Sequence, residues 1–156
     1  PGPCECKAAR SRPQITRMDD NPVARIRVLI VDDNVAVRSA LATFLLAFDD
    51  LELVGQADGG QEAIDLCLHT RPDVVLLDLS TPGMGSAAVI RAVRRRWPNI
   101  QVIALTTFQD IDLAREAIEA GAICCLLKNV SADKLAEAIR AAYASALDPA
   151  SAMTSS

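Results

Sequence analysis

Five polar residues of this sequence directly follow runs of aliphatic residues. Asp32 and Asp33 follow the first run, and Asp78 follows the third. The fourth run is followed by Thr106, which carries a hydroxyl group, and the fifth is followed by Lys128, which carries an ammonium group. A carboxylate can accept a phosphoryl group as a nucleophile, while a hydroxyl and an ammonium can stabilise the charge on its oxygens. If these strand ends share one edge of a sheet, the five side chains form a site for phosphoryl transfer.

The three carboxylates need a positive partner at such an edge. Three negative charges within a few ångströms repel one another unless a cation joins them. Oxygen ligands at the rim of a sheet suit Mg²⁺, which takes one or two carboxylates and keeps several waters. A zinc site is disfavoured, because paired Cys-x-x-Cys spacings are absent and the chain has one His. We therefore expect Mg²⁺ at Asp32, Asp33 and Asp78.

The aliphatic runs alternate with segments of helical periodicity. The pattern predicts strands at 26–31, 51–57, 72–78, 100–105 and 123–127, each followed by a helix. Strict alternation with right-handed crossovers gives an α/β fold, a doubly wound parallel sheet of five strands with five helices. The flavodoxin-like strand order 2-1-3-4-5 fits this count, and it places the ligand-binding switch point between the first and third strands. Those strands end in Asp32–Asp33 and in Asp78.

Composition limits the size and location of the protein. The chain has 156 residues, of which 51% are hydrophobic, enough for one domain with a full core. The net charge of −4 argues against nucleic-acid binding by this domain alone. No apolar stretch is long enough to span a bilayer and no signal-peptide pattern occurs, so we expect a cytoplasmic protein without membrane contact. Residues 1–24 are interpreted as a disordered or tag-like tail, 25–146 as the domain, and 147–156 as a linker or C-terminal tail.

Other conspicuous residues have plain structural interpretations. The basic run from Arg94 to Arg96 is interpreted as a solvated helix face rather than a nucleic-acid patch. Trp97, which follows it, is interpreted as a packing anchor rather than a binding residue. His69 is expected at the surface near the end of a helix, where its charge is tolerated.

The motifs together resemble the receiver domain of a two-component response regulator. The matching segments are 28–34, 73–79 with 82–84, 104–106, and 121–122 with 126–128. The sequence 126–140 and the residues 95–100 resemble the LuxR-type (NarL/FixJ-like) subfamily, in which a helix-turn-helix follows the receiver. The resemblance covers residues 25 to about 146 and implies a CheY-like fold.

The resemblance also implies roles for the clustered residues. Asp78 would be the phosphoacceptor for a sensor histidine kinase. Asp32 and Asp33 would hold Mg²⁺ together with the backbone carbonyl of Ser80, and Thr106 and Lys128 would bind the phosphoryl group.

The same resemblance implies a phosphoprotein that acts as a switch rather than as an enzyme on other substrates, catalysing only its own phosphotransfer and dephosphorylation. Its output would be regulation of transcription through a DNA-binding domain absent from this chain, which would make the only contact with DNA. Whether phosphorylation produces a homodimer stays open.

Some positions depart from the family pattern. Cys125 stands where an aromatic residue usually turns inward on activation, and Thr81 and Gly85–Ser86 replace common residues of the loop after Asp78. The resemblance also implies that Phe108 and Ser80 occupy the positions at which members of the family tune dephosphorylation.

Two alternative functions are kept. The first is a phosphorylation-independent receiver that acts as an interaction module, which Cys125 favours. The second is a phosphatase for small molecules with an aspartate nucleophile. It usually needs a second acid two residues after the nucleophile, where this chain has Ser80.

Overall fold

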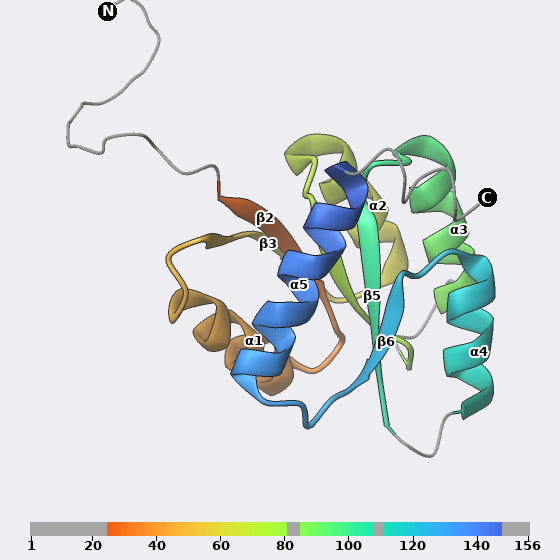
Figure 1. Cartoon of the computed structure of the whole chain (residues 1–156). Coiled ribbons are helices and arrows are strands. Elements are labelled where there is room, and N and C mark those ends of the chain that lie inside the picture. Colours follow the sequence, from red (N-terminus) through yellow and green to blue (C-terminus); the bar gives the residue numbers. More distant parts are fainter. Residues whose placement is uncertain (1–24, 81–84, 108–110, 148–156) are drawn as a thin grey trace, which may run out of the picture.

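The computed structural model describes residues 25–80, 85–107 and 111–147, in which five strands alternate with five helices (Figure 1). The strands are β2 (Ile26–Val31), β3 (Leu51–Ala57), β4 (Val74–Asp78), β5 (Gln101–Thr106) and β6 (Cys124–Leu127). The helices are α1 (Val35–Leu46), α2 (Gly60–Thr70), α3 (Ser86–Arg96), α4 (Ile111–Ala120) and α5 (Ala132–Leu147). None of the helices in these ranges is long and apolar enough to cross a membrane.

The strands form one parallel sheet in the order β3-β2-β4-β5-β6. Numbered along the described chain, this is the order 2-1-3-4-5, so the predicted fold class is confirmed. All five residues of β4 are buried, in agreement with the continuous aliphatic run that predicts a central strand. The carboxyl ends of β2 and β4 therefore lie side by side in the middle of the sheet.

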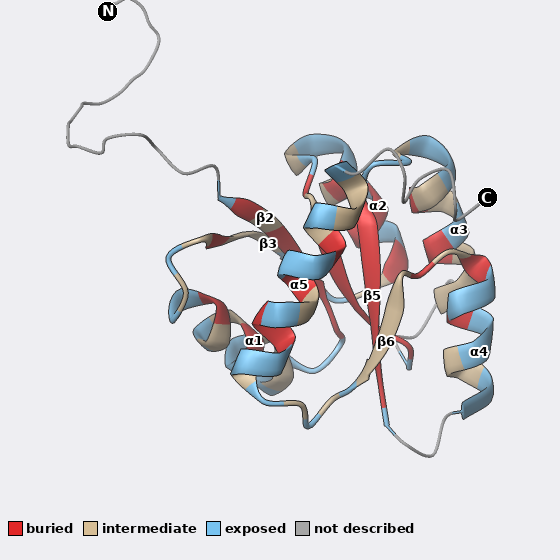
Figure 2. Ribbon diagram, viewed as in Figure 1, coloured by how far each residue is buried: buried red, intermediate tan, exposed pale blue. Residues whose placement is uncertain are grey.

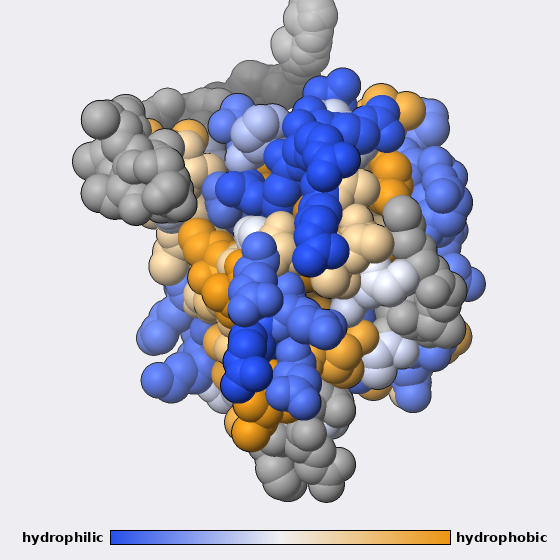
Figure 3. Space-filling model, turned by 90° about the vertical axis from the view of Figure 1, so that its right-hand side faces the viewer, coloured by the Kyte–Doolittle hydropathy of each residue, from blue (hydrophilic) through white to orange (hydrophobic). Residues whose placement is uncertain are grey.

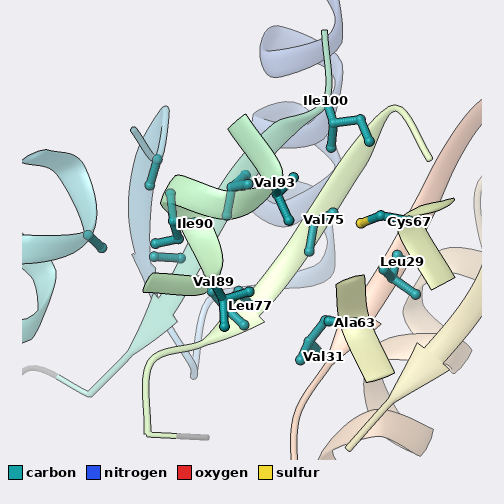
Figure 4. Packing of buried hydrophobic residues seen from close by; sticks show 14 of the residues in the cluster. Leu29, Val31, Ala63, Cys67, Val75, Leu77, Val89, Ile90, Val93 and Ile100 are labelled. Atoms are coloured by element: carbon teal, nitrogen blue, oxygen red, sulfur yellow. The ribbon is translucent and has the colours of Figure 1, made fainter. Parts of the chain in front are cut away.

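Helices cover both faces of the sheet and bury two hydrophobic clusters. Residues of α1 and α5 pack on one face, and residues of α2, α3 and α4 pack on the other. Figure 4 shows the second cluster, in which Val75 and Leu77 of β4 lie close to Val89 and Val93 of α3. Burial is concentrated in the inner strands and the inward faces of the helices (Figure 2). The edge of the sheet that carries the polar strand ends is thus held by two packed layers.

The edge strand β3 contains a shift in register at its glycine. Val28 pairs with Leu53, but the next residue of β2, Leu29, pairs with Gly55, so one residue of β3 is skipped. A Cβ at Gly55 would lie 3.2 Å from Cδ1 of Leu29, which is a tight contact. The glycine thus allows β3 to bulge against β2 and still continue as a strand.

Polar side chains and a glycine define three of the helix ends. The side chain of Asn34 accepts a hydrogen bond from the backbone of Val37 at 3.1 Å, and Ser131 accepts one from Lys134 at 3.2 Å. Gly121 ends α4 with φ +126°, a conformation that favours glycine. These caps fix where α1 and α5 leave the carboxyl edge of the sheet.

The interpretation of the basic run is correct for its last two residues and wrong for its first. Arg95 and Arg96 are exposed. Arg94 is half-buried, and its Nη1 donates hydrogen bonds of 2.6 Å to the carbonyls of both Pro98 and Ile100. These two bonds tie the end of α3 to the turn that leads into β5. Trp97 packs against the core cluster as predicted, and His69 is exposed at the end of α2.

Candidate functional site

The predicted site residues converge at the carboxyl edge of the sheet. In the register of β2 and β4, Val31 pairs with Leu77, which places Asp32 beside Asp78. Thr106 is the last residue of β5, and Lys128 follows β6 with its backbone N–H bonded to the carbonyl of Thr106 at 2.8 Å. One edge thus collects side chains from four strand ends.

Three carboxylates form a compact cluster at this edge. One oxygen each of Asp32, Asp33 and Asp78 lies within 4.8 Å of the others. Asp32 and Asp78 are buried, with 0% and 1% exposure, while Asp33 is exposed. Two of the three carboxylates are therefore buried and the third faces solvent. All the atoms of the cluster that could bind a cation are carboxylate oxygens.

The two oxygens of Asp32 have different surroundings. Its Oδ1 accepts a hydrogen bond of 2.8 Å from the backbone of Asn34. Its Oδ2 is buried without a hydrogen-bond partner among the described residues, 3.7 Å from Nζ of Lys128. Burial raises the pKa of Asp32, and the charge of Asp78 raises it further against the opposing bond from Asn34. Such an oxygen is available to a cation.

Lys128 supplies the positive charge of the site. Its Nζ lies 2.9 Å from Oδ1 of Asp78, and its side chain is 28% exposed. Burial by itself lowers the pKa of Lys128, but the hydrogen bond and charge of Asp78, together with the charges of Asp32 and Asp33, outweigh it and raise the pKa. The lysine is thus held in its charged form.

Two hydroxyl groups lie at the same edge. Ser80 is exposed, and its Oγ lies 3.0 Å from each carboxylate oxygen of Asp78. Its backbone N–H donates to Oδ1 of Asp78 at 3.1 Å. The buried hydroxyl of Thr106 donates to the carbonyl of Thr107 at 3.1 Å. Ser80 therefore orients the acidic group, while Thr106 bonds to the backbone of the next residue.

A residue that the sequence analysis did not single out also belongs to the site. Nη1 of Arg38, in the first turns of α1, donates a hydrogen bond of 2.5 Å to the backbone carbonyl of Asp32. The bond joins α1 to the loop that carries the acidic pair. The sequence does show an arginine in the first turn of the helix that follows Asp32 and Asp33. It does not show which backbone carbonyl the guanidinium group reaches.

The structure places Cys125 in β6 on the face of the sheet that α2, α3 and α4 cover. It pairs with Ala104 of β5 and is half-buried against the core cluster. Burial raises the pKa of its thiol. Two residues further along β6, Leu127 pairs with Thr106. The predicted role of Phe108 falls on a residue outside the described ranges.

A doubly wound sheet in this order, with clustered carboxylates and a lysine at its carboxyl edge, defines the class of receiver domains. The family model of the response regulator receiver domain matches residues 28–140. The chain belongs to this family.

The relatives indicate the subfamily. The chain is 43% identical over 117 residues to the transcriptional regulatory protein LiaR of Bacillus subtilis, covering 75% of this chain and 56% of LiaR. It is 36% identical over 119 residues to the response regulator GacA of Pseudomonas viridiflava, covering 76% of this chain and 56% of GacA. The chain thus spans about half the length of these curated relatives.

Solved structures agree with this grouping. The signal receiver domain of the putative response regulator NarL of Mycobacterium tuberculosis is 29% identical, with a TM-score of 0.73, covering 77% of this chain and 97% of that one. A DNA-binding response regulator of the LuxR family from Staphylococcus aureus, also 29% identical, has a TM-score of 0.70 and covers 76% and 98%. The chain is a LuxR-type receiver domain of a two-component response regulator.

Proposed function

We propose that Asp78 is the phosphoacceptor of this receiver. A phosphohistidine of a sensor histidine kinase would donate the group: the N–P bond of the donor breaks, a bond forms between phosphorus and a carboxylate oxygen of Asp78, and the freed imidazole nitrogen takes up a proton. The single observation that carries this proposal is the buried carboxylate of Asp78, held at 2.9 Å from Nζ of Lys128 at the carboxyl edge of the sheet.

The acidic cluster fits Mg²⁺. Its donors are oxygens, they lie within 4.8 Å of one another, and Oδ2 of Asp32 is buried without a hydrogen-bond partner among the described residues. We propose Asp32, Asp33 and Asp78 as ligands, with the backbone carbonyl of Ser80 as a fourth. When bound, the ion would neutralise charge on the phosphoryl oxygens. Lys128, whose Nζ lies 2.9 Å from Oδ1 of Asp78, would do the same.

Thr106 and Lys128 would convert the modification into a conformational change. The hydroxyl of Thr106 now bonds to the carbonyl of Thr107, and a phosphoryl group on Asp78 offers it a stronger, charged acceptor. A hollow of about 180 Å³ beside Thr106, Thr107 and Leu127 leaves room for the hydroxyl to turn. We propose that this turn shifts the neighbouring ends of β5 and β6 and so changes partner choice.

The output would be control of transcription in the cytoplasm. We propose that residues 25–146 form the receiver, that 1–24 and 147–156 are tails or linkers, and that a LuxR-type helix-turn-helix of the whole protein contacts DNA. The lengths of LiaR and GacA support this, since the chain covers 56% of each. Homodimer formation on phosphorylation belongs to the same proposal.

The test is phosphorylation by acetyl phosphate, measured as intact mass with and without Mg²⁺. We expect wild type to gain one phosphoryl group only with Mg²⁺, and Asp78→Asn to gain none. Asp65→Asn, which removes an exposed carboxylate on α2, is the matched control and should gain the group. A folded wild-type protein that gains nothing and also fails to respond to beryllofluoride would contradict the proposal.

A second candidate is a phosphorylation-independent receiver that acts as an interaction module. The half-buried thiol of Cys125 favours it, because it stands where an aromatic residue would couple to Thr106. Nuclear magnetic resonance of α4 and β6 decides between them. If beryllofluoride shifts the amide resonances of α4 and β6 in wild type but not in Thr106→Ala, the phosphoryl switch is supported. If these resonances do not change in wild type, the interaction module is supported.

A further inference from the structure

The opposite edge of the sheet carries a hollow that the phosphoryl site does not use. It has a volume of about 280 Å³ and is formed by the segments leading into β4 and β5. Its lining includes Arg71 and Asp73 from the first segment, and Arg96, Trp97 and Asn99 from the second. We call it the basal hollow. It lies at the amino ends of the same strands whose carboxyl ends carry the acidic cluster.

Two guanidinium groups lie near the indole ring of Trp97. Cζ of Arg96 is 4.5 Å from the ring centroid, and Cζ of Arg71 is 5.7 Å from it. The ring is fixed because Trp97 packs against the core cluster. A guanidinium stacked on an aromatic ring keeps the N–H groups in its plane for an anion. These two contacts therefore place two guanidinium groups at the basal hollow, and Nε of Arg71 also donates to the carbonyl of Leu68 at 3.2 Å.

The arginines of the basal hollow are not neutralised by a direct ion pair among the described residues. In the described ranges, neither Arg71 nor Arg96 forms an ion pair. The one carboxylate in the lining, Asp73, accepts the backbone N–H of Arg27 at 2.9 Å. The end of α3 adds two more arginines, and Figure 3 shows strongly hydrophilic side chains at the top of the face that α3 and α4 form. A positive local charge thus stands on a chain of net charge −4.

The backbone of Arg71 is in an unfavourable conformation. It has φ +48° and ψ +64° at the end of α2, and Pro72 follows it. Residues other than glycine rarely adopt this left-handed backbone conformation, and a residue before proline prefers an extended backbone. Glycine would end the helix with less strain. The partial negative charge at a helix C-terminus explains why arginines lie near the last turns of α2 and α3. It does not explain the left-handed backbone of Arg71, or why Arg71 and Arg96 both contact the ring of Trp97.

We propose that the basal hollow binds a carboxylate side chain from an acidic segment of a partner protein. The guanidinium groups of Arg71 and Arg96 would bind the carboxylate, and the exposed amide of Asn99 lies in the same lining to bond the partner's backbone. This surface is separate from the phosphoryl site and does not depend on it.

Trp97 is the only tryptophan of the chain, so its fluorescence reports directly on the basal hollow. The test titrates the whole chain with a hexaglutamate peptide at low salt and measures fluorescence, with affinity obtained in parallel by calorimetry. We expect a saturable change with hexaglutamate and none with hexaglutamine. Arg96→Gln and Arg71→Gln should each weaken binding by about tenfold or more, because each removes a charge-assisted hydrogen-bond donor.

Arg95→Gln is the matched control, since it removes the same charge from the same turn of α3 but not from the basal hollow. It should weaken binding by less than about twofold. Equal weakening by the control would mean diffuse attraction to the basic end, and absence of saturation would mean no site. Inorganic phosphate binding as tightly as the peptide would mean a simple anion site. Each of these three results overturns the proposal. If Arg71→Gln alters folding because the strained helix end changes, Arg96→Gln decides.

Discussion

The ammonium group of Lys128 lies 2.9 Å from the carboxylate of Asp78, although their strands β6 and β4 are not neighbours. The lysine side chain reaches across the end of β5, which lies between them. Asp78 is almost fully buried, with 1% exposure, whereas the side chain of Lys128 is 28% exposed. The ion pair therefore joins a buried carboxylate to an ammonium group that solvent can reach. Removing the lysine leaves a buried charge without its partner, which is costly in proteins.

The first prediction concerns Lys128→Met. Without Mg²⁺, we expect the free energy of unfolding to fall by about 2 kcal/mol, because a charged hydrogen bond to a buried carboxylate is lost. Urea denaturation measures this change. Lys134→Met removes an exposed lysine and should change stability by less than about 0.5 kcal/mol. Added MgCl₂ should restore more stability to the Lys128 variant than to wild type. Equal stability of the variant and wild type without Mg²⁺ would show that the ion pair contributes nothing.

The second prediction concerns Asp32→Asn. Oδ2 of Asp32 is buried without a hydrogen-bond partner in the described ranges, so the charged form is unfavourable in the ion-free protein. The variant should be more stable than wild type by about 1 kcal/mol at neutral pH without divalent ions. Its gain in stability on adding MgCl₂ should be smaller than that of wild type. Urea denaturation with and without MgCl₂ measures both effects.

Asp33→Asn is the control for this change. Its carboxylate is exposed, so stability in the ion-free protein should stay near that of wild type. A destabilised Asp32→Asn protein would instead mean that the carboxylate contributes to folding through its bond with Asn34 and its attraction to Lys128.

The fold and the main site residues could be predicted because each rests on a local pattern. Aliphatic runs that alternate with helical periods give parallel strands, and the usual strand order then places Asp32 beside Asp78. The burial of β4 and the caps at Asn34 and Ser131 follow from residues within a few positions of each other.

Other features depend on long-range contacts, which the hydrophobic periodicity of the sequence does not predict. Arg94 and Arg38 are polar residues on helices, and their burial depends on carbonyls that only the packed loops bring within reach. The bulge at Gly55 shifts the register by one residue while leaving the strand pattern unchanged. The contacts of Arg71 and Arg96 with the ring of Trp97 join two segments that meet only after folding.

The third prediction concerns Arg38, which donates to the backbone carbonyl of Asp32. Arg38→Ala frees the loop that carries the acidic pair, and we expect Mg²⁺ affinity to fall by about tenfold, as for other residues that orient metal ligands. Calorimetric titration with MgCl₂ measures the affinity. At saturating Mg²⁺, the rate of phosphorylation by acetyl phosphate should return close to that of wild type. Arg38→Lys should recover part of the affinity. A rate that stays low at saturating Mg²⁺ would contradict a positioning role.

The last prediction concerns pH and the contact between Asp50 and Arg140 of α5. Nε and Nη2 of Arg140 lie 2.7 and 3.0 Å from the two carboxylate oxygens. This hydrogen-bonded pair lowers the pKa of Asp50 below its ordinary 3.8, against a smaller effect of burial. The native state therefore binds this proton less tightly than the unfolded state. The stabilising contribution is complete above the ordinary pKa and is lost as pH falls through the lowered native value.

Asp50→Asn should thus be less stable than wild type at pH 7, and the difference should shrink as the solution is made acidic below the ordinary pKa of 3.8. We expect the difference at neutral pH to stay below about 1 kcal/mol, because the carboxylate is 35% exposed. Urea denaturation at a series of pH values measures it. Asp49→Asn, at the exposed neighbouring position, should show no such trend. A difference that is the same at every pH would mean that the variant loses packing or hydrogen bonding rather than charge.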